Sequence, residues 1–307
     1  MDNHDINRPF KRLVISGGGI KGYSILGALF YLESKNLISK VHDFYGTSIG
    51  SLICLFLAIG FTSTEIFTHF YENDKLLDPY QISKTLRENI ALLPISILGD
   101  RIRPILQQKL GNPDPTFTEL YELTGNNINI IGTNINTASM EHFCPQHTPH
   151  MKIIDAIEIS CCLPFLFSKK IYKNNVYIDG SLVNNYPVDL ADNGIDKVIG
   201  ISVVEKLDEI SECNQLTWMY RIMMIPMFEL YKTRLNDIGP HVKSIDLKIN
   251  VNVYNINIST EQKIKLFVDG HKMAKCIFEK NGDKNVDSKN SDHTLKNIKR
   301  RPKIKMD

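Results

Sequence analysis

Two strand–glycine turn–helix units fill the first sixty residues, and they constrain the fold more than any other feature. The first unit is an apolar strand at 11–16, a glycine-rich turn at 17–22 and a helix with an apolar stripe at 23–35. The second repeats this order over residues 41–59. Because crossover helices join parallel strands, such units predict an α/β fold with a central, mostly parallel sheet flanked by helices in three layers, α/β/α.

The rest of the chain adds elements of both kinds. Further strands are predicted at 129–136, 174–179 and 198–204, where β-branched residues cluster. Helices are predicted over most of 62–121, over 216–235 and over 260–279. Because proline lacks the helical N–H donor, breaks are expected within these helical regions. The prolines concerned are Pro79, Pro94, Pro104, Pro113 and Pro226.

Composition excludes several classes of protein. The chain has 307 residues, 43% of them hydrophobic, which is ordinary for a globular protein. Its formal net charge of +2 is too small to suggest a nucleic-acid-binding protein, so no nucleic-acid partner is expected. The basic excess lies in residues 280–307, which carry nine Lys and Arg against four Asp and Glu.

Targeting and cysteine patterns favour a cytoplasmic location. Residues 1–12 hold no apolar signal region, and the apolar stretch 49–61 is shorter than the roughly 20 residues of a membrane helix. The six cysteines show no C-x-x-C and no paired zinc spacing, and Cys161 and Cys162 are adjacent. We therefore expect a reduced protein with no metal, no cofactor, no signal peptide and no transmembrane helix. His147 is interpreted as a loop residue.

The turn in the second unit fits G-x-S-x-G, with Gly46, Ser48 and Gly50 at the fixed positions. In this motif a sharp strand-to-helix turn holds a serine Oγ above the sheet, and small residues are needed because the turn is crowded. Its position between a strand and an apolar helix favours a nucleophile. The alternative is a tight turn that happens to contain a serine.

The first turn is ambiguous. Gly17, Gly19 and Gly22 match G-x-G-x-x-G, and Asp43 follows about 20 residues later, which is the outline of a dinucleotide-binding turn. Exposed backbone N–H groups at the start of a helix also suit an oxyanion hole. A third possibility is that the glycines only allow a helix to pack closely on a strand.

A third motif, Asp179-Gly180-Ser181, follows a predicted strand. An aspartate in this position can project into a cleft at the carboxyl edge of a sheet. Taken alone, an Asp-Gly pair is more often a simple turn.

Together these motifs resemble the patatin-like phospholipase family. Three motifs occur in the same order as in that family. They are the glycine turn with Lys21 and Gly22, the G-x-S-x-G turn at Ser48, called the elbow below, and the aspartate motif. The segment 156–165 and the continuation 184–188 also look like the family's sequence. The resemblance covers about residues 11–204. It departs where Lys21 replaces a more usual Arg, and where Ser181 replaces a more usual Gly or Ala.

The resemblance implies a calcium-independent lipid acyl hydrolase, phospholipase A-type, that uses a Ser–Asp dyad and an acyl-enzyme. Carried onto this chain, Ser48 is the nucleophile and Asp179 the general base. The oxyanion hole comes from backbone N–H groups of Gly17 to Gly19, with Gly18 and Gly19 preferred over Gly17. The implied partners are a phospholipid or another acyl lipid, with transient contact with a membrane surface.

The implied organisation is a patatin-like catalytic domain at 11–204, a C-terminal helical extension at 205–279 packed on the same domain, and a basic tail without ordered structure at 280–307. A run rich in Met and aromatics at 218–228 is interpreted as a core helix, or alternatively as an acyl-chain-lining or membrane-facing element. Sequence alone leaves the oligomeric state open.

Three alternatives to the Ser–Asp hydrolase remain open at this stage: two other functions and one other catalytic mechanism. A dinucleotide-binding oxidoreductase would use the glycine turn with Asp43 and leave Ser48 without a role. A Ser–Asp–His triad would use His241 or His271, which follow Asp179 in the chain. A non-catalytic lipid-binding module would keep the fold without the chemistry.

Overall fold

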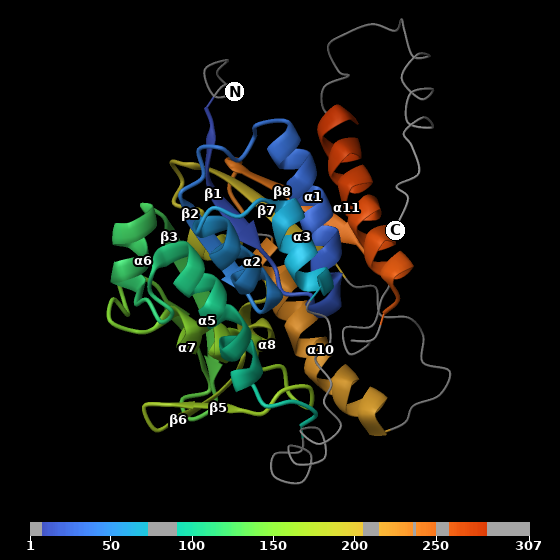
Figure 1. Ribbon diagram of the computed structural model, residues 1–307. Helices are drawn as coiled ribbons and strands as arrows, with labels where there is room; N and C mark the ends of the chain where they lie inside the picture. The colour runs from blue at the N-terminus through green and yellow to red at the C-terminus, as the bar shows by residue number, and fades with distance from the viewer. Residues whose placement is uncertain (1–7, 73–90, 205–214, 236–237, 250–257, 281–307) are drawn as a thin grey trace, which may run out of the picture.

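The computed structural model describes residues 8–72, 91–204, 215–235, 238–249 and 258–280. Within them an eight-stranded sheet runs in the order β5-β6-β3-β2-β1-β7-β8, and β4 also pairs with β3 (Figure 1). The strands are β1 (Phe10–Ile15), β2 (Asp43–Thr47), β3 (Asn127–Asn134), β4 (Ser139–Phe143), β5 (Lys170–Tyr172), β6 (Asn175–Asp179), β7 (Lys197–Val204) and β8 (Val242–Lys248).

The centre of the sheet is parallel. Strand β1 pairs in parallel with β2 on one side and with β7 on the other, and the parallel pairs β2–β3 and β7–β8 extend the sheet outward. Parallel strands place their carboxyl ends at one edge of the sheet, and the turns that follow β1 and β2 therefore lie next to each other. Both turns carry candidate site residues.

The remaining strands are antiparallel and meet β3. Strand β2 pairs with β3 as far as Ile131, and β6 pairs with β3 from Gly132 onward, in the opposite direction. Strand β4 pairs with β3 over residues 130–134, so it occupies the other edge of β3. It follows that β2 and β6 share one edge of β3 and meet there by their carboxyl ends.

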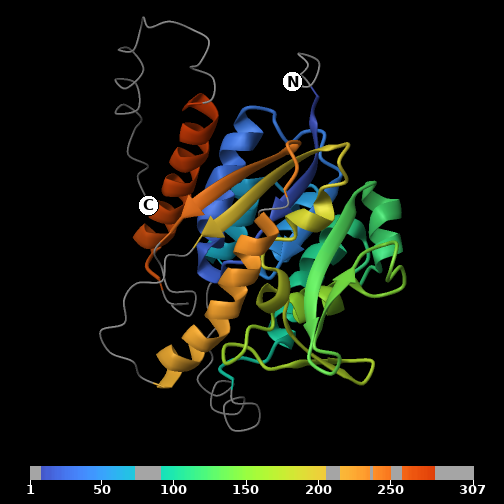
Figure 2. The ribbon, with the colours of Figure 1, turned by 180° about the vertical axis from the view of Figure 1, so that it is seen from behind.

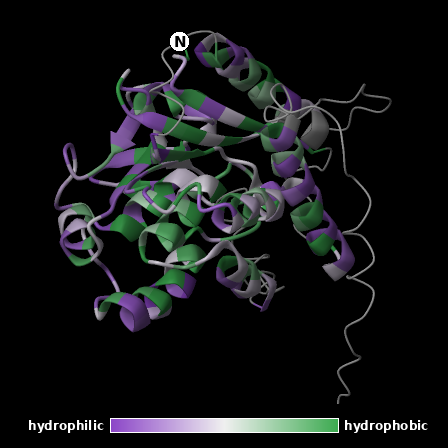
Figure 3. Ribbon diagram, turned by 90° about the horizontal axis from the view of Figure 1, so that it is seen from above, coloured by the Kyte–Doolittle hydropathy of each residue, from purple (hydrophilic) through white to green (hydrophobic). Residues whose placement is uncertain are grey.

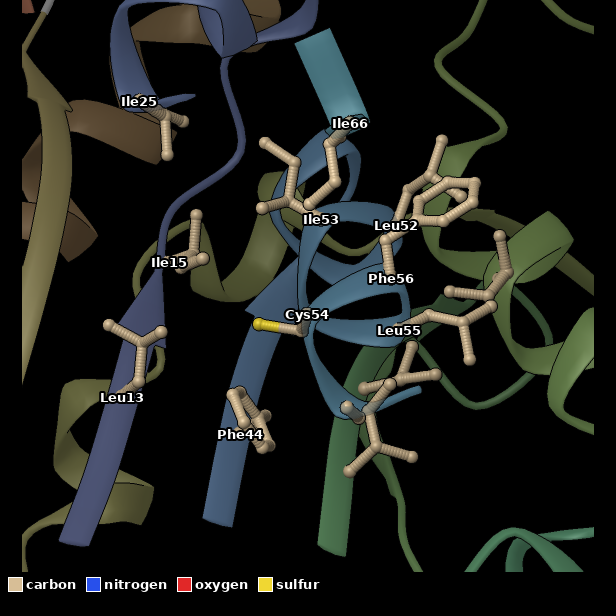
Figure 4. Packing of buried hydrophobic residues seen from close by; sticks show 14 of the residues in the cluster. Leu13, Ile15, Ile25, Phe44, Leu52, Ile53, Cys54, Leu55, Phe56 and Ile66 are labelled. Carbon is tan, nitrogen blue, oxygen red and sulfur yellow. The ribbon is translucent and has the colours of Figure 1, made fainter. Parts of the chain in front are cut away.

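One face of the sheet carries the main hydrophobic core. The helices on this face are η1 (Gly19–Lys21), α1 (Gly22–Ser34), α2 (Ile49–Ala58), α3 (Ser63–Glu72), α5 (Ser96–Leu110), α6 (Phe117–Thr124), α7 (Ile153–Cys161) and α11 (Thr260–Lys280). Helix α2 lies centrally, and its Ile53 and Cys54 pack towards Ile15 and Phe44 of the sheet (Figure 4). Helix α11 packs against α1, as Figure 1 shows.

The opposite face is covered by α8 (Ser181–Asn184), α9 (Val188–Ala191) and α10 (Gln215–Leu235). A smaller core there joins Val14, Tyr45 and Tyr186, with Tyr231 of α10 packed against it. Figure 2 shows α10 in front of the sheet, on the side away from α1. Hydrophobic and hydrophilic residues alternate along the helices, as expected for helices with one buried side (Figure 3). These layers confirm the predicted α/β class with a central sheet flanked by helices.

Some local predictions were wrong. Pro104 lies inside α5 and Pro226 inside α10, so neither proline ends its helix. Each costs a helical hydrogen bond, but tertiary packing of an amphipathic helix overrides that local penalty. The segment 205–279 was expected to be helical, yet it also supplies strand β8, whose alternating Ile245 and Leu247 are buried.

Several expectations fall outside the described residues, among them Pro79 and the tail that follows residue 280. In the part of the chain that the structure describes, no helix is long and apolar enough to cross a membrane. The five cysteines in that part are free thiols, and four of them are buried.

Candidate active site

Ser48 stands between β2 and α2 in a strained turn. Its φ is 53° and its ψ −130°, a conformation that a residue with a side chain rarely adopts. The positions two residues before and after Ser48 have to be glycine, because a Cβ would not fit there. A Cβ on Gly46 would lie 2.6 Å from the backbone N of Ser51, and one on Gly50 would lie 2.4 Å from the carbonyl O of Ile15. The G-x-S-x-G pattern therefore forms the crowded elbow that the sequence predicted.

The Ser48 hydroxyl donates a hydrogen bond to Asp179, with Oγ and Oδ2 2.7 Å apart. The sheet register explains why residues 131 positions apart meet. Thr47 ends β2 opposite Ile131 and Asp179 ends β6 opposite Gly132, so the two strands deliver these side chains to neighbouring positions on β3.

Asp179 is completely buried, and burial raises the pKa of its carboxyl from 3.8 to about 6. Hydrogen bonds from Ser181 and Ser48 act in the opposite direction and lower this pKa, but burial outweighs them. The Ser181 backbone N–H donates to Oδ1 at 2.8 Å, which leaves Oδ2 for the serine hydroxyl. Gly180 fits because a Cβ there would lie 2.1 Å from the carbonyl O of Ile131.

Ser160 supports the elbow in a way that sequence reasoning missed. Its buried hydroxyl oxygen accepts a hydrogen bond from the Ser48 backbone N–H at 2.9 Å. Its carbonyl accepts the Gly180 N–H at 3.3 Å. Ser160 thus links the serine turn to the aspartate turn. It lies in the 156–165 segment that resembles the family, but nothing in the sequence assigns it this role.

The glycine turn lies beside Ser48. A Cβ on Gly17 would approach the Asn185 Oδ1 to 2.4 Å and the Ser48 Cβ to 3.2 Å. The Gly17 N–H donates to the Asn185 carbonyl at 3.0 Å, which removes Gly17 from the predicted oxyanion donors because its hydrogen is already used. Among the described residues, neither Gly18 N nor Gly19 N donates to another backbone group.

The helix that follows the turn fits tightly against the elbow. A Cβ on Gly22 would lie 2.8 Å from Cγ1 of Ile49, so this glycine permits close packing. Lys21 is 1% exposed, and its backbone N–H closes the turn on the Gly18 carbonyl at 3.0 Å.

A cavity of about 580 Å³ opens onto Ser48. Its lining is mainly apolar and also includes the glycine turn and the basic residues Lys21, Arg101 and Lys263. The apolar walls come from α2, α5, α10 and the segment after α7, and they include Leu52, Phe56, Ile102, Ile105, Leu163, Phe167, Met223, Met224, Met227 and Phe228. A cavity of this size and lining suits an apolar ligand.

The Met-rich helix α10 has two faces. Met223, Met224, Met227 and Phe228 line the cavity, so this side of α10 is not simply packed in the core. On the outside, Trp218, Met219, Ile222 and Ile225 are between 36% and 59% exposed.

The structure disagrees with the dinucleotide-binding alternative. Asp43 lies at the amino end of β2, paired in register with Arg12, whereas the glycine turn follows the carboxyl end of β1. The Arg12 Nε lies 3.6 Å from Asp43 Oδ2, and Asn127 donates to Oδ1 at 2.7 Å. The carboxylate is therefore engaged about 10 Å or more from the turn, given the rise per residue along a strand.

The histidine triad is also unsupported. His241 precedes β8 at the amino ends of the parallel strands, where its carbonyl accepts the Val198 N–H. His271 lies on α11 against the rings of Phe30 and Tyr31. The histidine that does line the cavity, His69, stacks on the Phe56 ring.

Comparison with known proteins agrees with this geometry. The "Probable lipid hydrolase 463L" of Invertebrate iridescent virus 6 is 35% identical over 186 residues, which cover 59% of this chain and 63% of that protein. The "cGAMP-activated phospholipase" of Escherichia coli strain TW11681 is 25% identical over 203 residues, covering 59% of this chain and 55% of that protein. The match thus spans less than two thirds of either relative.

In fold, the chain is similar to the crystal structure of VipD from Legionella pneumophila. The TM-score is 0.59 at 17% sequence identity, and the alignment covers 88% of this chain and 67% of that one. The profile of the family described as "Patatin-like phospholipase" matches residues 13–192, more than half of the chain. This range contains the glycine turn, the serine elbow and the aspartate motif. The chain belongs to the patatin-like phospholipase family.

Proposed function

We propose that this protein hydrolyses a carboxylic ester of a phospholipid or a related acyl lipid, with Ser48 as nucleophile and Asp179 as general base. The observation that carries the proposal is the 2.7 Å hydrogen bond from Ser48 Oγ to Asp179 Oδ2, with Ser48 in the lining of a mainly apolar cavity. Membership of the family and the names of the two relatives point to the same chemistry.

The reaction begins when the Ser48 Oγ attacks the ester carbonyl carbon and its proton passes to Asp179 Oδ2. The tetrahedral intermediate collapses, the C–O bond to the alcohol breaks, and Asp179 returns the proton to the leaving alcohol. Asp179 then takes a proton from water, whose oxygen attacks the carbonyl carbon of the acyl-serine. The second tetrahedral intermediate collapses, the bond from the acyl carbon to Ser48 Oγ breaks, and Asp179 returns the proton to Oγ as the fatty acid is released. A pKa of about 6 makes Asp179 a better base than an exposed aspartate.

The developing oxyanion needs donors close to the elbow. The backbone N–H groups of Gly18 and Gly19 are the candidates, since Gly17 is engaged by Asn185. Each such donor typically lowers the barrier by about 3 kcal/mol. In this mechanism charge is stabilised by backbone dipoles and the proton is moved by a carboxylate, so it needs no calcium ion.

Vesicle hydrolysis with matched variants tests the proposal. The substrate is a phosphatidylcholine with two different acyl chains, and mass spectrometry of the products identifies which ester is cut. Ser48→Ala should reduce hydrolysis to background, and Asp179→Asn should reduce it by roughly 10²–10⁴-fold. Cys276→Ser, an exposed site on α11, serves as the control that keeps full activity. Wild-type activity in Ser48→Ala would reject the nucleophile assignment.

Two further controls separate this mechanism from its rivals. Hydrolysis should persist in excess chelator, because no step requires a metal. It should also persist after replacement of His241 and His271, which lie away from the dyad. Loss of activity on chelation would contradict the metal-free mechanism, and loss with either histidine variant would favour a triad.

We also propose that α10 contacts the lipid surface from which the substrate is drawn. One side of this helix lines the cavity, and the other exposes Trp218, Ile222 and Ile225 at the spacing of one helical face. A helix of this kind places the cavity beside the apolar surface that supplies the acyl chain.

Vesicle sedimentation tests the membrane contact. Burying the two half-exposed isoleucines contributes about 2 kcal/mol, so Ile222→Ser/Ile225→Ser should weaken partitioning roughly 30-fold. Hydrolysis of a soluble short-chain ester should change little, because Ser48 is untouched. Ile195→Ser is the control, since Ile195 is 70% exposed but lies before β7, at the opposite edge of the sheet. Equal losses in both variants would contradict a specific contact through α10.

A further inference from the structure

A second cluster of chemically reactive side chains lies at the end of β4, apart from the serine and aspartate. His142, Cys144 and His147 offer one nitrogen or sulfur each, and these three atoms all lie within 4.8 Å of one another. The two imidazole rings are 5.1 Å apart between centroids and nearly perpendicular. The spacing is H-x-C-x-x-H, which a search for paired cysteines does not detect.

A tight turn brings the three residues together. The Cys144 carbonyl accepts the N–H of His147 at 3.2 Å and the N–H of Thr148 at 2.8 Å. The Cys144 N–H in turn donates to the Thr148 Oγ1 at 3.1 Å. Backbone hydrogen bonds therefore form the turn, and the positions of the three side chains follow from it.

The hydrogen bonding of His142 leaves one ring nitrogen for a ligand. Its Nε2 lies 2.9 Å from Asn129 Oδ1. Asn129 donates its own Nδ2 to the Phe44 carbonyl at 3.2 Å, which fixes Oδ1 as the atom facing the ring. Nε2 therefore carries the proton, and Nδ1 keeps its lone pair. Metal-bound histidines typically donate their second ring N–H to a fixed acceptor in this way.

Cys144 is 1% exposed, so burial raises the pKa of its thiol, and the nearby backbone N–H groups of His147 and Gln146 offset part of that rise. A metal ion that binds here displaces the thiol proton, because the thiolate is the form that binds a metal. His147 is exposed, so the cluster has one open side.

The position of the cluster separates it from the hydrolytic site. The His142 ring lies 6.5 Å from the ring of Tyr45, which belongs to the smaller core on the α9 and α10 face. Its neighbour Phe44 points to the α2 face, because successive side chains alternate across a strand. None of the three cluster residues lines the cavity at Ser48.

We propose that His142, Cys144 and His147 form a binding site for a zinc-class divalent cation, with solvent or a further ligand in the fourth position. Two imidazoles and a thiolate are the donor set that Zn²⁺ and similar borderline ions prefer. Tetrahedral coordination places ligand atoms roughly 3.5 Å apart, so the exposed His147 has to move by about 1 Å. On binding, the Cys144 S–H bond breaks, the S–metal bond forms and the proton passes to solvent.

Such an ion would clamp the connection between β4 and α7. Helix α7 carries Ser160, which holds the Ser48 turn, so the cation would stabilise the fold near the site without taking part in the hydrolysis. The proposal stands independently of the ester hydrolase mechanism.

Cobalt titration of the metal-stripped full-length chain tests this site. Co²⁺ bound through a thiolate gives a charge-transfer absorption, and we expect one equivalent to produce it and Zn²⁺ to abolish it. His147→Ala removes an exposed ligand without disturbing the core, and it should weaken Co²⁺ binding by roughly tenfold or more. Cys144→Ser should abolish the absorption.

Two control variants test whether Co²⁺ binds at this cluster or at another thiol or histidine. Cys276→Ser removes the exposed thiol, and His150→Ala removes a nearby histidine outside the cluster; both should keep the absorption. Zn²⁺ should raise the melting temperature of the wild type but not that of His147→Ala. No absorption in the wild type, or its loss in Cys276→Ser with retention in His147→Ala, would overturn the proposal. Neither result would bear on hydrolysis, because the readout is metal binding.

Discussion

Replacing Asp179 by asparagine should reduce hydrolysis by roughly 10²–10⁴-fold and at the same time stabilise the protein at neutral pH. Asparagine has the shape of aspartate, and its Oδ1 can still accept the Ser181 N–H that now binds at 2.8 Å. Its amide can donate to the Ser48 hydroxyl, so the hydrogen bonds of the site are kept. The change removes only the buried charge.

The size of the effect follows from the pKa of Asp179. Burial raises this pKa from 3.8 to about 6, a shift of about two units, and each unit corresponds to about 1.4 kcal/mol. The ionised carboxylate therefore costs up to about 3 kcal/mol of folding free energy above pH 6. Asparagine carries no such cost.

The pH dependence gives the sign of the effect. Below pH 3.8 the carboxyl is protonated in both folded and unfolded chains, and the variant should match the wild type in stability. Between pH 3.8 and about 6 the unfolded chain ionises first, so the wild type loses stability as the pH rises. Above pH 6 the difference should stay constant at its maximum.

Urea unfolding of both proteins from pH 4 to pH 8 measures this difference. We expect the free energy of unfolding of Asp179→Asn to exceed that of the wild type by up to about 3 kcal/mol at pH 8, and the gap to close towards pH 4. Cys276→Ser is the control, because this exposed site on α11 lies away from Asp179 and its variant should follow the wild type at every pH. A gap that does not change with pH, or a variant that is less stable at pH 8, would refute the link between burial, charge and catalysis.

Three further predictions concern the same site. The kcat/KM for a soluble ester should fall on the acid side with an apparent pKa near 6, because protonated Asp179 cannot act as base; an acid limb near pH 4 would contradict this. Ser160→Ala should lower kcat more than it changes KM and cost about 1–3 kcal/mol of stability, since the Ser48 N–H loses its acceptor; unchanged kcat with reduced stability would make Ser160 purely structural. Gly50→Ala should abolish activity and sharply lower the melting temperature, because its Cβ meets the Ile15 carbonyl at 2.4 Å, and a stable, active variant would contradict the elbow geometry.

The elbow and the general fold could be predicted because they depend on local sequence. A strand, a crowded turn with two required glycines and an apolar helix follow one another in the chain, and the structure keeps that order around Ser48. Glycines at fixed spacing indicate positions where a side chain would not fit, and such glycines can be found in the sequence directly. The predicted α/β layers follow from the same local units.

The meeting of Ser48 with Asp179 could not be derived from local pattern. It depends on β6 joining β3 in the antiparallel direction at Gly132, immediately beyond the end of β2. Pairing between distant strands leaves no periodic signal, so only the resemblance to a family linked the two residues. The role of Ser160 was missed for the same reason, because its partner lies 112 positions away.

Other errors arose where tertiary context decides. Gly17 looked like an oxyanion donor until its N–H was found on the Asn185 carbonyl. Pro226 predicted a break, whereas α10 continues through it and lines the cavity with Met224 and Met227. For Gly17 the deciding contact comes from a segment far along the chain. For Pro226 the packing of α10 outweighs the local preference for a break.

Labelling with a lipid-like fluorophosphonate tests the central claim most directly. The reagent phosphonylates only an activated serine, and mass spectrometry of the digested protein locates the modified residue. At pH 8 the wild type should be labelled at Ser48 alone, Ser48→Ala should not be labelled, and Asp179→Asn should be labelled far more slowly although it is folded and stable. Labelling at another serine, or equal rates in the wild type and Asp179→Asn, would contradict a serine activated by the buried carboxylate.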